Sequence, residues 1–539
     1  MRSEELEVMN DCAETNSLSP YQGPWTTVQA AHLLRRATFG VDKAKLQTAI
    51  DLGMEGAVSK LLEDLPFSEL PLNYDYVLDP NVPVGDTWVN APFHGANGYM
   101  SRSFRAWIVG RQLSDEFNLR EKMVLFWHNH FVVESRDVND PRYLFRYIKI
   151  FIENPFGSFR DLVEKVTLDP AMLRYLNGNQ NRRQSPNENY ARELFELFTL
   201  GKGELAGPGD YTTFTEDDVR AAARVLTGWQ DVGYRNIQTG NILVDYVNNR
   251  HDTGIKQFSH RFGNAVIQNE GNQEYKRLID LIFQKPETAE FICRKLYRWF
   301  VYYKIDEPIE SEIIQELAAD LRAADYSIKP VLKKLLSSQH FYDAQLRGCM
   351  VKSPVEFISH MVSLIKLRPN NTTLVQRYRH WLSIAQLQRR MQMEYFNAPD
   401  VAGWKAYYQE PSFNQLWINP VSIQNRAGVV TRIVLNENNG INFNGTYDVI
   451  PLIDSFSNPF DINEILDELN KLVLPYPFTE SQKTAIKEVV LPGLPDYEWT
   501  LEYELHKENP NNVQVRRSLE QKFRMMLSYI MQMPEYQLI

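Results

Sequence analysis

Apolar residues recur at helical spacing along most of this chain. The i, i+3, i+4, i+7 pattern of one buried helix face first occurs at Ala30, Leu33, Leu34 and Ala37. Gly40 then suits the end of that helix. The same periodicity returns in segments 43–63, 101–135, 142–176, 186–229, 273–395 and 455–539. The pattern predicts a mainly α protein, built as a globular array of many helices.

Three segments interrupt this pattern. Residues 65–100 hold five prolines, which break regular structure and predict a long loop. Residues 230–270 mix Tyr, Ile, Val and Phe with Asn, Gly and Thr, a composition typical of a small β-hairpin insertion. Residues 397–425 are rich in Pro and Trp and predict a second loop.

These boundaries divide the chain into three expected parts. Residues 1–24 are polar and lack a clear period, so we expect an N-terminal tail. Residues 25–435 form the helical core, which contains the hairpin insertion. Residues 436–539 form a helical extension that we expect to pack on the core.

Composition narrows the class of protein. Hydrophobic residues make up 43% of the chain and aromatic residues 12%, enough for a large core. The net charge of −10 argues against a nucleic-acid binder, which needs basic residues to neutralise phosphates. The three cysteines, Cys12, Cys293 and Cys349, do not form a disulfide or metal-binding pattern.

The N-terminal residues carry no recognisable address. They are acidic and lack the apolar core of a secretory signal peptide. No stretch approaches the roughly 18 apolar residues of a membrane span. We therefore expect a protein without a membrane span, cytoplasmic as its sequence stands, and leave open that an export signal precedes Met1.

His128 and His130 are the first candidates for chemistry. The preceding run, 120–127, favours a helix, and positions i and i+2 of a helix lie about 200° apart. We therefore predict that the two histidines face opposite sides and do not bind one metal ion together. Either one of them, His130 by preference, belongs to a site, or both are hydrogen-bonded structural histidines.

The segment Ser185–Gly201 is the second candidate. We expect Ser185 to cap a helix that starts at Pro186 and stops at Gly201. On that helix Asn189, Glu193 and Glu196 share one face. Such a row is either a solvated, ion-paired edge or an inward-facing polar site.

Two arginines can serve the same site. Arg192 can reach Glu188 or Glu196 on its own helix. Arg224 lies on the next predicted helix, and it can pair with Glu193 or Glu196 where the two helices meet. Such a pair is structural as readily as catalytic.

The last candidates follow that next helix. Its start at Thr215, with Asp218 three residues later, has the spacing of a capping box. His251 and Asp252 open the following loop, either as part of a site or as a turn stabilised by the Asp252 side chain. The chain lacks a Gly-x-Ser-x-Gly elbow, a P-loop, a His-Glu-x-x-His motif and a dinucleotide fingerprint, which disfavours those reactions.

Several blocks, taken in order, are similar to one known family. The blocks are Leu33–Gly40, Lys122–Phe131, Asn187–Gly201, Asp218–Ala223, Leu226–Trp229, His251–Asp252, Lys352–Phe357 and Asn397–Trp404. Together they resemble the bacterial domain of unknown function 1800 family, over residues 27–435. One departure is Phe198, where some members of that family carry histidine.

The resemblance implies little about activity, because the family is largely uncharacterised. Its members are often exported, which keeps a periplasmic or secreted location open. They are often encoded beside a second uncharacterised family that resembles alkaline phosphatases and sulfatases. The resemblance therefore suggests a phosphatase- or sulfatase-like partner.

Our first hypothesis is an enzyme whose pocket gathers polar residues from several helices. One histidine would act as base or metal ligand, a glutamate as its partner and an arginine as an anion clamp. The pocket residues would be His128, His130, Arg192, Glu193, Glu196, Arg224 and His251.

A metal-dependent version of this enzyme would use a smaller set. Mixed histidine and carboxylate ligands favour zinc, iron or manganese over calcium, with a hydrolytic or oxidative reaction. The candidate ligands are His130, Glu193, Glu196 and His251. The alternative hypothesis is a non-catalytic binding or assembly protein, in which the same residues are buried ion pairs that hold helices together.

Overall fold

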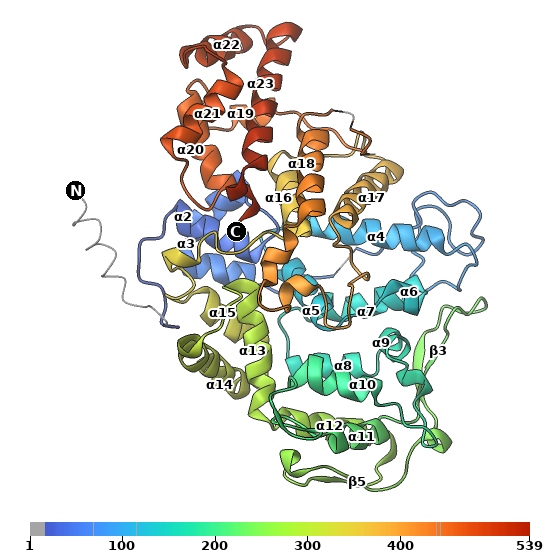
Figure 1. Ribbon diagram of the computed structural model, residues 1–539. Helices are drawn as coiled ribbons and strands as arrows, with labels where there is room; N and C mark the ends of the chain where they lie inside the picture. The colour runs from blue at the N-terminus through green and yellow to red at the C-terminus, as the bar shows by residue number, and fades with distance from the viewer. Residues whose placement is uncertain (1–16, 68, 115, 438, 442) are drawn as a thin grey trace.

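The structure is a computed structural model that describes residues 17–67, 69–114, 116–437, 439–441 and 443–539. Helices dominate it, and short strands form two-stranded antiparallel sheets (Figure 1). The prediction of a mainly α array with a small β insertion is confirmed.

The first part of the chain, up to residue 225, is mainly helical. Thr26 and Asp42 cap its first two helices, because each side chain accepts a hydrogen bond from a first-turn N–H. A long loop follows at 62–67 and 69–97, as the prolines predict. The helices here are α2 (Thr27–Ala37), α3 (Lys43–Leu61), α4 (Gly98–Gln112), α5 (Arg120–His130), α6 (Ser135–Val138), α7 (Pro141–Glu153), α8 (Phe159–Thr167), α9 (Pro170–Tyr175), α10 (Glu188–Glu193) and α11 (Glu216–Val225).

Short hairpins surround α11. Two lie in the segment predicted as an insertion, namely β3 (Trp229–Val232) with β4 (Leu243–Tyr246) and β5 (Lys256–Gln257) with β6 (Val266–Ile267). A third pairs β1 (Leu205–Gly207) with β2 (Asp210–Tyr211), and it was not expected. Its strands are too short to show an apolar alternation in the sequence.

The next part returns to helices and folds back on the first. α4 packs against α17, so segments far apart in the chain lie side by side (Figure 1). The elements are α12 (Glu274–Phe283), α13 (Pro286–Phe300), η6 (Ile309–Ile314), α14 (Gln315–Ala323), α15 (Ile328–Leu336), α16 (Pro354–Leu364), α17 (Leu374–Arg390) and α18 (Pro420–Val434).

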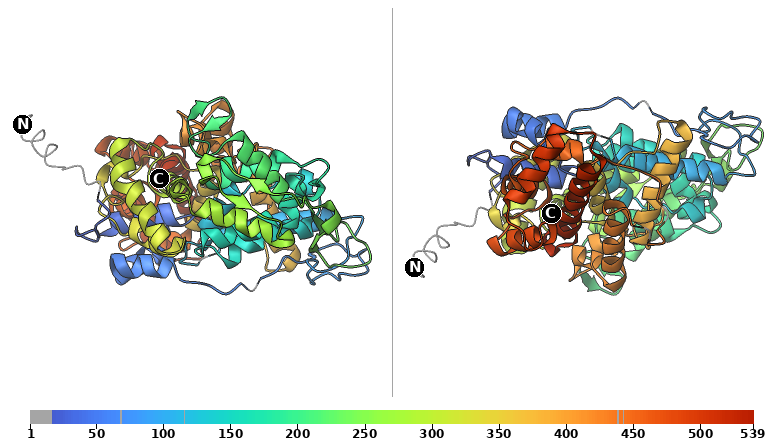
Figure 2. Two further views of the ribbon diagram at one scale, coloured as in Figure 1. Left: turned by 90° about the horizontal axis from the view of Figure 1, so that it is seen from below. Right: turned by 90° about the horizontal axis from the view of Figure 1, so that it is seen from above.

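The C-terminal helices gather at the end of the molecule opposite β5 (Figure 1). They are α19 (Ile450–Asp454), α20 (Ile462–Val473), α21 (Glu480–Val490), α22 (Tyr497–Glu508) and α23 (Val513–Gln532). α23 packs against α18, and Val351 forms a β-bridge with Leu538. Seen from above, these helices cover one half of the molecule (Figure 2).

One large hydrophobic core runs through the described residues, from Leu18 to Tyr536. It includes buried side chains on both sides of residue 436, among them Trp127, Trp404 and Trp499. The extension therefore shares its core with the helices before it. In the part of the chain that the structure describes, no helix is long and apolar enough to cross a membrane.

The predicted N-terminal tail lies only partly within the described residues. Residues 1–16 are outside them. Leu18 is buried, and Pro20 forms a β-bridge with Ser338. Residues 17–21 therefore contact the helical core through Leu18 and through backbone hydrogen bonds to residues 337–340.

Candidate functional site

His128 and Asn129 hold the loop that follows α17. The Nε2 atom of His128 accepts a hydrogen bond from the backbone N–H of Phe396 at 3.1 Å. The Oδ1 atom of Asn129 accepts one from the backbone N–H of Trp404 at 3.0 Å. Two neighbouring side chains of α5 therefore satisfy buried backbone donors in the segment 395–404.

The His128 ring is enclosed by aromatic side chains. It contacts the rings of Tyr395, Phe396 and Trp404. Burial lowers the pKa of His128 to about 3, so the ring is neutral at neutral pH. Because Nε2 accepts, the ring proton sits on Nδ1, which has no partner among the described residues.

Gly403 lets this loop approach α5 closely. Its φ of +100° is a conformation that L side chains rarely adopt. A Cβ atom at this position would lie 2.4 Å from Asn129 Oδ1 and 2.7 Å from Asn129 O. Glycine at position 403 therefore permits a close approach to Asn129 that a larger residue would prevent, and the next residue, Trp404, donates its N–H to the same side chain.

His130 has different partners. Its Nε2 donates to the Phe198 carbonyl at 2.9 Å, and its Nδ1 accepts from Lys295 Nζ at 3.2 Å. Burial and the Lys295 charge hold the pKa of His130 well below its usual range. Burial also lowers the pKa of Lys295 to about 7. The two histidines have separate surroundings, as the helical geometry predicted.

The helix of the second block differs from its prediction. Asn187 caps it by accepting from the Asn189 N–H, so the helix starts two residues later than the Ser185–Pro186 pair suggested. After Glu193 the chain changes to the π-helical turn η2 (Leu194–Thr199). The extra residue per turn alters the register between Glu193 and Glu196, and such turns frequently occur at functional sites.

Glu193 and Glu196 have unequal surroundings. Burial raises the pKa of Glu193 to about 7, with further contributions from the charges of Glu196 and Asp400. Glu193 makes no hydrogen bond or ion pair with another described residue. Glu196 lies 3.4 Å from Lys202. Glu193 is therefore the candidate whose protonation changes near neutral pH.

Each of the two arginines forms its shortest ion pair with a residue that the sequence did not suggest. Arg192 binds Glu216 of α11 through both oxygens, at 2.7 and 2.6 Å. It also lies 3.4 Å from Glu188, as the sequence suggested. Arg224 binds Asp252 at 2.8 and 3.1 Å, not Glu193 or Glu196. Both are bidentate ion pairs that tie α11 to neighbouring segments.

His251 belongs to a buried ionic group. Its Nε2 lies 2.9 Å from Glu274 Oε1, and the other oxygen of Glu274 accepts from Lys256 Nζ at 2.5 Å. Its Nδ1 contacts the Thr227 carbonyl at 2.9 Å. Burial by itself raises the pKa of Glu274, but His251 and Lys256 outweigh it and lower that pKa. The group joins the β4–β5 loop to α12.

These contacts do not gather the candidate residues into one pocket. His128 is hydrogen-bonded to the loop at 395–404, His130 to η2 and α13, and His251 to α12. Within the described ranges, no group of three or more His, Cys, Asp or Glu side chains is placed to hold a metal ion.

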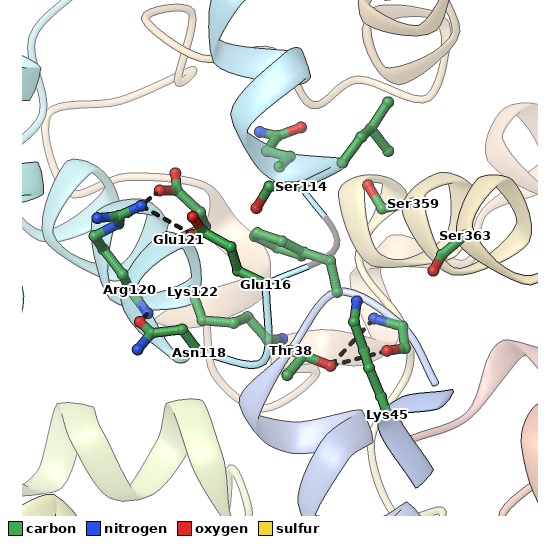
Figure 3. A pocket seen from close by; sticks show the side chains of 14 residues that line it. Thr38, Lys45, Ser114, Glu116, Asn118, Arg120, Glu121, Lys122, Ser359 and Ser363 are labelled. Carbon is green, nitrogen blue, oxygen red and sulfur yellow. Dashed lines mark hydrogen bonds and ion pairs between the residues drawn. The ribbon is translucent and has the colours of Figure 1, made fainter. Parts of the chain in front are cut away.

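A small enclosed pocket lies where three of the sequence blocks meet. It is lined by Thr38–Gly40 and by Lys122, while Ser359 and Ser363 lie on the opposite side (Figure 3). Lys122 forms an ion pair with Glu356. The pocket volume of about 30 Å³ matches one water molecule. These blocks therefore join α2, α5 and α16 and leave no room for a substrate.

A much larger cleft of about 780 Å³ lies beside the loop at 395–404. Its walls come from α4, α6, the end of α17 and residues 392–417. The lining residues are Arg105, Ser135, Arg136, Arg389, Gln392, Met393, Glu394, Asn397, Pro399, Trp404, Lys405, Ala406, Leu416 and Trp417.

The cleft is positively charged. Arg105 and Arg389 each approach Glu394, its one lining carboxylate, at 3.6 Å. Arg136 and Lys405 have no ion-pair partner among the described residues. The lining side chains thus carry an excess of three positive charges in a chain whose net charge is −10.

A group of carboxyls lies close to the same loop but does not line the cleft. Its members are Glu134, Asp137, Glu193 and Asp400. Burial raises the pKa of Glu134, and the charges of Asp137 and Asp400 add to this effect, while the charge of Arg136 opposes it. Asp400 likewise contributes to the raised pKa of Glu193. The segment 134–137 therefore contributes Arg136 to the lining of the cleft and Glu134 and Asp137 to the acidic group beside it.

The cationic residues of the cleft were not among the residues predicted from the sequence. Arg105, Arg136, Arg389 and Lys405 lie on separate elements, and no spacing rule links them. The one available signal was the block Asn397–Trp404, which adjoins Lys405 and follows Arg389 closely. Its glycine and tryptophan mark a loop held in a defined position.

The chain belongs to the DUF1800 family, described as proteins of unknown function, whose model matches residues 32–538. The match continues past residue 435, where the resemblance was expected to end, so it includes the C-terminal helices. No curated protein and no solved structure matches the chain.

Proposed function

We propose that this protein binds an anionic ligand in the cleft lined by Arg105, Arg136, Arg389 and Lys405. The observation that carries this proposal is the excess positive charge of the cleft within an acidic protein. Arginine and lysine side chains that lack a protein partner remain available to a carboxylate, sulfate or phosphate group.

The shape and lining of the cleft suit a small molecule or a short segment of a polymer. Its volume of about 780 Å³ falls within the range of small-molecule sites. Leu416 and Trp417 supply apolar surface beside the charges, whereas Met393 is fully buried beneath them. We therefore expect an anionic group attached to an apolar or cyclic body.

The sequence blocks support this site indirectly. His128, Asn129 and Gly403 position the loop that carries Trp404 and Lys405. In this account His128 is a positioning residue, and Arg192, Arg224 and His251 are structural. This favours the hypothesis of a non-catalytic binding protein, and a phosphatase- or sulfatase-like partner remains a prediction within it.

Glu193 favours a second candidate function, an enzyme that uses acid–base catalysis. Its pKa of about 7 suits a group that exchanges a proton at neutral pH, and Asp400 connects it to the loop beside the cleft. Because Glu193 does not line the cleft, such an enzyme would bind its substrate at the neighbouring acidic group and not at the cationic side chains. Glu193→Gln would then abolish turnover and leave ligand affinity unchanged, whereas a pure binding protein has no turnover to lose.

The contacts of the four side chains that were predicted to bind a metal ion do not support a metal site. His130, Glu193, Glu196 and His251 have separate partners, and no metal-binding group exists among the described residues. Zinc, iron and manganese are therefore not part of the proposal.

Calorimetry with a matched set of small ligands tests the proposal. Phenyl phosphate, phenyl sulfate and benzoate each carry a negative group on a phenyl ring. Phenol has the same ring with a neutral group, and benzylamine has it with a positive group. We expect at least one of the anions to bind and the neutral and cationic compounds not to bind. Equal binding by phenol, or binding of benzylamine alone, would contradict the proposal.

A further inference from the structure

α22 presents an apolar strip to solvent. Tyr497, Leu501 and Leu505 recur every four residues, and they are 60%, 48% and 54% exposed. Residues four apart lie on the same side of a helix. Trp499 and Tyr503, on the other side, are buried in the core. The helix is therefore apolar on both sides, although the core uses only one of them.

Carboxylates border this strip. Glu498, Glu504 and Glu508 lie on the same helix, and none of them forms an ion pair with another described residue. Two further charges are already neutralised, since Glu502 pairs with Lys522 and Lys507 pairs with Asp454. The open side of α22 thus combines apolar side chains with uncompensated negative charge.

We propose that α22 is the docking site for a basic amphipathic helix of a partner protein. Such a helix offers apolar residues at i, i+4 and i+7 to the strip, and its lysines or arginines meet Glu498, Glu504 and Glu508. Contiguous exposed apolar surface with a polar rim is typical of a protein–protein contact. This surface lies at the end of the molecule opposite β5 (Figure 1), and the proposal does not depend on the function of the cleft.

Charge argues against two other occupants. A second copy that paired its own α22 with this one would bring Glu504 and Glu508 against like charges. An anionic membrane surface would repel the same carboxylates. A basic helix satisfies both the apolar strip and the charge.

Two synthetic amphipathic peptides, with leucines at helical spacing, test this proposal. One has lysines at its polar positions, and the other has glutamates. In fluorescence anisotropy with the full chain, we expect the lysine peptide to bind about tenfold or more tightly than the glutamate peptide. Equal binding of the two peptides would overturn the proposal.

Variants locate the binding. Leu501→Ser/Leu505→Ser should weaken the lysine peptide about tenfold or more. The matched control Ile237→Ser/Leu243→Ser, at exposed apolar residues of the β3–β4 region, should not change its affinity. Unchanged binding by the Leu501/Leu505 variant, or an equal loss in the control, would overturn the proposal.

A charge variant keeps the test open if the serine variant does not fold. Glu504→Lys/Glu508→Lys leaves the apolar strip intact and should transfer the preference to the glutamate peptide. An unchanged preference would contradict the proposal. Light scattering tests for a second copy as the occupant. If the wild type is a dimer and Leu501→Ser/Leu505→Ser is a monomer, a second copy occupies the strip and the proposal is overturned.

Discussion

His128 Nε2 accepts a hydrogen bond from the backbone N–H of Phe396, which lies 268 residues further along the chain. This contact links the most histidine-rich segment of the sequence to the loop that forms one wall of the cationic cleft. It gives the motif a positioning role, because an uncharged buried imidazole satisfies a backbone donor that water cannot reach.

Gly403→Ala tests whether the close approach of this loop matters. The added Cβ would meet Asn129 at distances that require a backbone shift, and the positive φ adds strain. We expect a loss of about 2–4 kcal/mol in the free energy of unfolding, measured by urea denaturation. In the control Gly493→Ala, φ is also positive but nothing lies within 4 Å, so only the smaller strain cost of about 1 kcal/mol applies. Equal losses in the two variants would refute the close contact.

The pH dependence of stability follows from His128. The pKa of about 3 in the folded protein lies below the unfolded value near 6.5. As the pH falls below that value, the unfolded state binds a proton that the folded state does not, so stability is lost. His128 should contribute up to about 1.4 kcal/mol per pH unit to this loss between the two pKa values, about 6.5 and about 3. His128→Gln should remove that part of the slope in urea denaturation, and an unchanged slope would contradict its burial as a neutral ring.

Much of the fold was predictable, because local patterns determine it. The capping box at Thr215 and Asp218 and the apolar stripe of α2 are visible within a few residues, and both are present. The predicted start of α10 was wrong because Ser185 and Asn187 are both residue types that cap helices well. Tertiary contacts decide which of them is the cap. The Asn187 side chain accepts from the Asn189 N–H, and the backbone N–H of Asn187 donates to Asn181 Oδ1, which fixes Asn187 in the capping position.

The site was much less predictable. Arg224 had two plausible glutamate partners in the sequence, but Asp252 is reached only through the loop after β4. The cleft needs Arg105 of α4 and Arg389 of α17 at the same carboxylate, which depends on the packing of these two helices. Periodicity describes single helices and does not say which helices become neighbours.

Glu274→Gln tests the structural role of His251. The change leaves the Lys256 ammonium buried beside a neutral amide, and breaking a buried ionic group costs about 3–5 kcal/mol. Urea denaturation should show this loss. The control Glu63→Gln breaks the exposed Lys60–Glu63 pair and should change stability by less than about 0.5 kcal/mol. A small effect of Glu274→Gln would remove the structural account of His251.

Glu193→Gln should stabilise the protein at high pH. The raised pKa means that the charged carboxylate is disfavoured in the folded state above pH 7, chiefly by burial and then by Glu196 and Asp400. Removing this charge should raise the free energy of unfolding by about 1 kcal/mol at pH 8, allowing for solvent screening. The gain should shrink as the pH falls to 5, because the folded carboxyl then carries a proton. A destabilised variant at pH 8 would contradict the assigned surroundings.

The central claim is tested most directly by the double variant Arg136→Gln/Arg389→Gln. The measurement is the dissociation constant of this variant for the phenyl anion that binds the wild type best. Each arginine can give the ligand a charge-assisted hydrogen bond, and losing both should weaken binding by about tenfold or more. The control Arg322→Gln/Arg517→Gln removes two exposed arginines that do not line the cleft, and it should bind as the wild type does. An anion-binding cleft predicts a loss in the first variant alone. Unchanged affinity in Arg136→Gln/Arg389→Gln, or an equal loss in the control, would contradict it.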